Sequence, residues 1–108
     1  MISWNDFEKI EMRGTIISID DFAEARHPAY KLTIDFGEFG IKKSSAQITK
    51  FYSKAMLLNR QVIAVVNFPP EQIANFFSEC LVLGITGSDN EVVLLQPERK
   101  VINGRHIC

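Results

Sequence analysis

Short stretches in which apolar and polar residues alternate run through most of the chain. The clearest covers residues 30–36, where two aromatic and two aliphatic side chains alternate with Lys31, Thr33 and Asp35. Such alternation places the apolar side chains on one face of a strand. Short segments between turn residues predict further strands at residues 11–20, 41–48, 61–68, 80–85 and 91–96, of which 61–68 is largely apolar and is expected to be buried. Because Gly, Pro and Asn separate these stretches, the chain is predicted to be all-β with many short strands.

Three other segments have helical character. A short helix is expected over residues 4–9, with Asn5 or Asp6 as its N-cap. A second short helix is expected over residues 49–58, between the third and fourth strands, and a helical turn over residues 71–77.

The order of these elements indicates the fold class. Gly14, inside the first strand, predicts a bulge or sharp bend of the kind that small barrels use at their corners. Five or six strands with a helix between the third and fourth match the OB-fold, a five-stranded Greek-key barrel. An open sandwich is the competing topology, but the helix and the early bend favour the barrel. We therefore expect residues 1–108 to form one OB-fold domain with short helices and N- and C-terminal extensions.

Composition points to an ordinary globular protein of a reducing compartment. Hydrophobic residues make up 46% and charged residues 23% of the chain. The first residues carry acids where a secretory signal has bases, and no apolar run approaches the roughly 20 residues that cross a bilayer. Cys80 lies in an apolar strand pattern, Cys108 is the last residue, and a disulfide between them is not expected. These features predict a cytoplasmic protein that does not insert into membranes.

Charge is distributed unevenly although the net charge is only −1. Residues 39–70 contain no acid and five bases, which are Lys42, Lys43, Lys50, Lys54 and Arg60. Such a segment predicts either a local positive surface that attracts a ligand or a solvated face that keeps the protein soluble.

The sequence lacks the common motifs of enzymes and metal sites. Its two histidines, His27 and His106, lie in a loop and in the tail. Zinc sites use closely spaced ligands such as CxxC or HExxH, and neither motif occurs. A phosphate-binding loop and a GxSxG nucleophile motif are also missing. We therefore expect a binding protein, not an enzyme, with no catalytic residues, metal or cofactor.

Two regions are candidates for the binding surface. OB barrels bind ligands across the face of their second and third strands, and the third strand here is polar and basic. Phe68 precedes Pro69-Pro70, and Phe76 and Phe77 follow shortly after. Packing in the core is the alternative for each ring. If exposed, the rings predict an apolar patch with a basic rim, suited to extended polypeptide or to unpaired bases.

Several segments resemble those of a known family. They are residues 7–16, 28–37, 41–49, 65–70 and 78–84, and the resemblance around them extends in order over nearly the whole chain. They are similar to the CsaA-like chaperones, a branch of the tRNA-binding-domain family that includes the C-terminal appendage of bacterial methionyl-tRNA synthetases. The resemblance implies an OB-fold homodimer of the bacterial cytoplasm. It also implies a chaperone in protein export that binds unfolded preproteins and the export ATPase SecA.

The alternative function within this family is binding of tRNA through the same face of the barrel. The Ser-Glu-Gly-Met motif of the tRNA-binding relatives appears here as Ser78-Glu79-Cys80-Leu81, with its glycine and methionine replaced. That departure, together with an isoelectric point near 6.1, favours polypeptide over tRNA.

The sequence and the resemblance together nominate two sets of residues. The predicted polypeptide- or tRNA-binding residues are Lys31, Lys42, Lys43, Ser44, Gln47, Asn67, Phe68, Phe76, Ser78 and Leu81. The predicted dimer interface consists of Trp4, Phe7, Val101, Ile102, Asn103 and Gly104, because apolar side chains outside the barrel need a surface to cover them.

Overall fold

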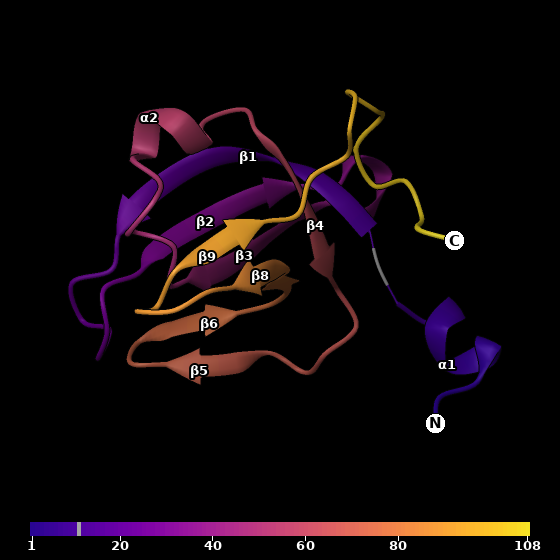
Figure 1. Ribbon diagram of the computed structural model, residues 1–108, viewed down its shortest axis with the longest axis horizontal. Helices are drawn as coiled ribbons and strands as arrows, with labels where there is room; N and C mark the ends of the chain where they lie inside the picture. Colours follow the sequence, from indigo (N-terminus) through magenta and orange to yellow (C-terminus); the bar gives the residue numbers. More distant parts are fainter. Residues whose placement is uncertain (11) are drawn as a thin grey trace.

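A five-stranded antiparallel sheet forms the body of the protein (Figure 1). The structure is a computed structural model that describes residues 1–10 and 12–108. The sheet has the strand order β3-β2-β1-β4-β7. Its strands are β1 (Met12–Asp21), β2 (Tyr30–Asp35), β3 (Ile41–Ala46), β4 (Gln61–Val65) and β7 (Leu81–Val82). The first residue of the strand predicted over 11–20, Glu11, lies outside the described residues.

The two edges of this sheet are brought together by hydrogen bonds ahead of β7. The Glu79 backbone N–H donates to the Lys43 carbonyl at 2.7 Å, and the Lys43 N–H donates to Glu79 Oε1 at 2.9 Å. The Ser45 N–H also donates to Ser78 Oγ at 3.3 Å. Together with the helix α2 (Lys54–Leu57) between β3 and β4, this arrangement is the predicted OB-fold.

Gly14 allows the long strand β1 to pair with β2 and β4. A Cβ at this position would lie 2.6 Å from Ile34 Cγ2 and 2.7 Å from the Asp35 carbonyl oxygen, so the close approach requires glycine. The bulge that was predicted at Gly14 lies farther along the strand, where the register with β2 shifts between Ile16 and Ser18.

The core is built from the inward faces of the strands and one residue of α2. Its fully buried side chains include Ile16, Leu32, Ile34, Phe36, Leu57 and Val62. The alternation predicted for residues 30–36 is confirmed, because burial alternates along β2. The helix predicted over residues 49–58 is shorter in the structure, because residues 49–53 are not helical. Tyr52 turns into the core there, where its hydroxyl accepts a hydrogen bond from the Leu94 N–H at 3.0 Å.

Two hairpins lie beside the main sheet, in the orange part of Figure 1. One pairs β5 (Glu71–Ile73) with β6 (Phe76–Ser78), and the other pairs β8 (Gly84–Thr86) with β9 (Val92–Leu94). The helical turn predicted over 71–77 is therefore wrong. The chain reverses at Ala74, which adopts a positive φ of 53°, and the aromatic residues that follow favour a strand.

The strand predicted over 80–85 is divided into β7 and β8. The Leu83 N–H donates to the Ile63 carbonyl of β4, whereas the Leu83 carbonyl accepts from Leu95, after β9. The chain thus changes its pairing partner at Leu83, which no alternation pattern reveals.

The chain begins with the helix α1 (Trp4–Glu8), which stands apart from the sheet in Figure 1. Its N-cap is Ser3, where the sequence suggested Asn5 or Asp6. Asp6 instead completes a capping box, because its carboxylate accepts from the Ser3 N–H at 2.9 Å. Within the described part of the chain, no helix has the length and apolar character needed to cross a membrane.

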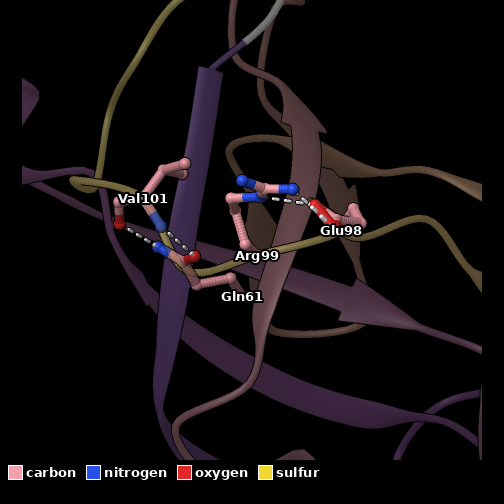
Figure 2. Close-up of polar contacts among 4 residues, drawn as sticks. All are labelled: Gln61, Glu98, Arg99 and Val101. Atoms are coloured by element: carbon pink, nitrogen blue, oxygen red, sulfur yellow. Dashed lines mark hydrogen bonds and ion pairs between the residues drawn. The ribbon is translucent and has the colours of Figure 1, made fainter.

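The C-terminal tail is fastened to β1 and β4. The Gln61 side chain donates to the Val101 carbonyl at 2.6 Å and accepts from the Val101 N–H at 3.0 Å (Figure 2). Thr15 Oγ1 donates to Asn103 Oδ1 at 2.7 Å, and the Gly104 N–H donates to the Arg13 carbonyl. These bonds make residues 101–104 part of the barrel's outer wall.

Candidate functional site

An open pocket of about 440 Å³ lies between the end of β4 and the β5–β6 hairpin. Its lining residues are Ser45, Phe68, Pro69, Glu71, Ile73, Ser78, Glu79, Cys80 and Leu81. Phe68 leaves 56% of its surface exposed and Leu81 leaves 49%. A half-exposed aromatic ring beside an aliphatic side chain can cover an apolar side chain of a ligand.

The local sequence explains why this pocket forms. β4 ends at Val65, three residues short of the strand predicted over 61–68, and Pro69-Pro70 cannot resume the pairing because proline has no N–H to donate, so the chain leaves the sheet. The β5–β6 hairpin then brings it back to the edge of β3, where Glu79 is bound. Phe68 projects at the departure point and Leu81 begins the return strand, so the two apolar residues face the same opening.

Cys80 forms a buried part of the lining, with 5% of its surface exposed. Burial raises the pKa of its thiol to about 11, because desolvation disfavours the thiolate. At neutral pH the side chain is therefore a neutral, weakly polar surface and not a nucleophile.

Ser44 does not face a ligand, contrary to its place among the predicted binding residues. Its side chain is fully buried, and its hydroxyl donates to the Cys80 carbonyl at 2.8 Å. The Ser78 hydroxyl donates to the same Cys80 carbonyl at 3.2 Å, and Ser78 also lines the pocket. Ser44 thus supports the wall of the pocket from inside.

The charges at the pocket differ from the predicted basic rim. Two carboxylates, Glu71 and Glu79, belong to the lining, and among the described residues no Lys or Arg does. Lys43 is exposed and lies on the same face of β3 as Ser45, next to the pocket, whereas Lys42 is on the opposite face. The pocket is therefore apolar with carboxylates in its wall and one neighbouring base.

Lys31 and Phe76 do not line the pocket and contact each other instead. The Lys31 ammonium lies 5.5 Å from the centre of the Phe76 ring and 4.7 Å from that of Phe22. The two rings meet edge to face at 5.3 Å. This cluster fixes the hairpin against β2 and leaves Phe76 half-buried, outside the lining.

Two other predicted residues are also separate from the pocket. Gln47 lines a smaller hollow of about 210 Å³ together with His27 and Lys50. The Asn67 side chain donates to the Lys9 carbonyl, which ties the segment after α1 to the end of β4. Of the ten predicted binding residues, the structure brings Phe68, Ser78 and Leu81 together in one lining.

The residues predicted for a dimer interface fall into two groups. Trp4 is 76% exposed, and with Phe7 and Cys108 it lines a hollow of about 430 Å³ at the chain ends. Ile102 is also exposed. Gly104 is buried where the C-terminal tail is hydrogen-bonded to β1.

One exposed apolar pair was missed by the sequence reasoning. Ile85 and Val93 face each other across the β8–β9 hairpin, with exposed fractions of 61% and 49%. The signal was present in the sequence, because both residues lie in short apolar strands next to a turn.

One protein family matches the part of the chain that forms the barrel and its C-terminal tail. The family described as "Putative tRNA binding domain" matches residues 12–106. The chain belongs to the tRNA-binding-domain family. Among curated members, the methionine–tRNA ligase of Thermococcus onnurineus is 31% identical over 107 residues, and that of Pelodictyon phaeoclathratiforme is 28% identical over 107 residues. The chain spans 14% and 15% of these two proteins.

Two of the solved structures that are similar over the full chain are CsaA chaperones. The chaperone CsaA of Bacillus anthracis is 49% identical with a TM-score of 0.94, and covers 100% of this chain and 99% of its own. The CsaA chaperone of Picrophilus torridus is 53% identical with a TM-score of 0.92, and covers 100% of both chains. The predicted resemblance to CsaA-like chaperones is confirmed.

Proposed function

We propose that this protein is a chaperone that binds unfolded segments of preproteins in the pocket between Phe68 and Leu81. The observation that carries the proposal is the open apolar lining, in which both side chains are about half exposed. The similarity to two CsaA chaperones supports the same function. In this proposal the protein works in the cytoplasm, also binds the export ATPase SecA and catalyses no reaction.

The charges in the wall of the pocket favour client segments that carry a base. Glu71 and Glu79 lie in the wall, so a bound segment that carries Lys or Arg next to an apolar residue gains a favourable electrostatic interaction. Anionic ligands are disfavoured at the same place. This is a departure from the cationic rim that the sequence suggested, and it separates the pocket from a phosphate-binding surface.

In the same proposal the chaperone is a homodimer. The apolar hollow at Trp4 and Phe7, the exposed Ile102 and the Ile85–Val93 pair would each lose water on association. Two pockets on one particle raise the avidity for a long unfolded chain through effective concentration.

The second candidate function is tRNA binding. It is favoured by the family and by the acid-free segment 39–70, whose exposed bases include Lys43 and Lys50. Phosphate neutralisation would make such binding depend steeply on salt, whereas binding by apolar burial would not.

A side-by-side binding assay separates the two functions. Anisotropy is measured for a labelled, denatured preprotein fragment and for a labelled tRNA, each at about 50 and about 200 mM salt, the range over which phosphate-dominated binding collapses. We expect the fragment to bind at both salt concentrations and tRNA not to displace it. Binding of tRNA alone, or displacement of the fragment by tRNA at low salt, would refute the proposal.

A further inference from the structure

A second hollow, of about 390 Å³, lies at the other end of β4 from the apolar pocket. It is formed by the turn between α2 and β4 and by residues 96–100. Figure 1 shows α2 and the β5–β6 hairpin on opposite sides of the molecule. Because β4 separates the two places, a ligand in one leaves the other open.

Arg60 is held in a fixed position at this hollow by uncharged partners. Its Nε donates to the Met56 carbonyl at 3.3 Å, and its Nη1 donates to Gln96 Oε1 at 3.3 Å. Its guanidinium carbon also lies 5.2 Å from the centre of the Tyr52 ring. In the described part of the chain, no carboxylate forms an ion pair with it. A guanidinium has five N–H donors, so the remaining donors can form a fork on an anionic group.

The neighbouring charges leave the hollow positive. Arg99 and Glu98 neutralise each other through two hydrogen bonds, one of them from Nη2 to Oε1 at 2.9 Å (Figure 2). Lys100 is exposed and, among residues 1–10 and 12–108, has no ion-pair partner. Its backbone is held in place because the next residue, Val101, is hydrogen-bonded to Gln61. Arg60 and Lys100 therefore remain as two uncompensated cations.

Apolar surface lies directly beside these cations. Met56 is 50% exposed and Leu58 is 53% exposed, and both line the hollow. We propose that this hollow is a docking surface for an acidic, apolar segment of a partner protein. A carboxylate of the segment is bound by Arg60 and Lys100, and an adjacent apolar side chain covers Met56 and Leu58.

Polypeptide fits this surface better than nucleic acid does. Two bases release few counterions, so phosphate contacts alone would give weak binding. Tyr52, the ring nearest to Arg60, is only 8% exposed and cannot stack on a base. This proposal does not depend on the apolar pocket, and together the two surfaces would let one barrel bind an unfolded client and a partner protein at once.

The test uses a fluorescein-labelled twelve-residue peptide that repeats Glu-Glu-Leu-Phe, and a second peptide with glutamine in place of every glutamate. Anisotropy is measured with the wild-type chain, Arg60→Gln, Lys100→Gln and the control Arg26→Gln, an exposed base of the loop after β1. We expect about tenfold weaker binding for Arg60→Gln, because a fork of two charge-assisted hydrogen bonds is lost, and about threefold for Lys100→Gln, as for an exposed charge pair. Arg26→Gln should bind like the wild type.

Two further variants keep the test decisive. Arg60→Lys retains the charge without the fork and should fall between the wild type and Arg60→Gln, provided that circular dichroism shows an intact fold for each. Phe68→Ala should bind the acidic peptide like the wild type, because Phe68 belongs to the other pocket.

Three results would overturn the proposal. They are no binding of the acidic peptide at about 1 mM protein, equal binding of the glutamine peptide, and unchanged affinity in both Arg60→Gln and Lys100→Gln. If a twelve-nucleotide single-stranded RNA binds more tightly than the peptide and loses affinity in the same variants, the surface is a nucleic-acid site instead.

Discussion

Replacement of Phe68 by alanine gives the sharpest prediction for client binding. A phenylalanine side chain contributes roughly 200 Å² of surface, and Phe68 leaves 56% of its surface exposed. A client that covered all of it would bury about 110 Å², worth about 2.8 kcal/mol at about 25 cal/mol per Å². Partial coverage brings the expected loss to about 1.4 kcal/mol, which is a tenfold increase in Kd.

The assay is fluorescence anisotropy with a labelled, denatured preprotein fragment. Phe51→Ala is the matched control, because Phe51 is 43% exposed and does not line the pocket. Phe68→Ala should bind about tenfold more weakly and Phe51→Ala should bind like the wild type, with circular dichroism showing a native fold for both variants. Equal affinities for the two variants would show that Phe68 is not a contact and would refute the reasoning.

Three further predictions concern charge, packing and ionisation. Glu71→Gln should weaken binding of a lysine-bearing client peptide by about two- to fivefold and leave an uncharged peptide unaffected, as for an exposed charge pair; equal effects on both peptides would contradict it. Gly104→Ala should lower the free energy of unfolding in urea by more than about 2 kcal/mol, because φ is +82° and the new Cβ would overlap the Phe36 carbonyl oxygen. Gly40→Ala, which is also at positive φ but has open space for a Cβ, should lower the free energy of unfolding by less than Gly104→Ala does. The Cys80 thiol, whose pKa is raised from 9.0 to about 11, should stay unreactive toward a disulfide reagent at pH 8 while Cys108 reacts.

The ionisation of Cys80 also fixes a pH dependence of stability. The unfolded thiol loses its proton near pH 9.0, whereas the folded one keeps it until about pH 11. Between these values the folded state binds more protons, so the free energy of unfolding falls as the pH rises. Cys80→Ala should remove this part of the decline, which urea titrations at pH 8 and pH 10 can measure.

Much of the barrel could be predicted because its strands alternate with an apolar inner face. In β2 the alternation fixed both the strand and its buried residues. In β3 the run Lys42 to Ser45 contains no apolar residue, so nothing in the sequence indicates which side faces inward. Ser44 was therefore assigned to the ligand face although it is fully buried. The prediction failed because tertiary contacts with Cys80, distant in sequence, decide the orientation.

In the candidate site, too, one part could be predicted from the local sequence and another part could not. The exposure of Phe68 agrees with the two prolines that follow it, because they prevent the chain from pairing again after β4 ends at Val65. The acidic wall does not follow from any local pattern. Glu79 belongs to the pocket because its backbone and carboxylate bind Lys43 on β3, and that contact exists only once the barrel has closed. Glu71 lies in the β5–β6 hairpin, where the sequence pattern predicts a helical turn.

The central claim is that client polypeptide lies in the pocket of Phe68 and Leu81. A two-dimensional amide NMR titration with an unlabelled preprotein fragment tests it most directly. The account predicts that the largest shift changes fall on the amides of Phe68, residues 71–73 and residues 78–81, while those of residues 56–60 and 98–100 remain unchanged. Changes confined to the exposed residues of β3, or to the hollow at Arg60, would contradict it.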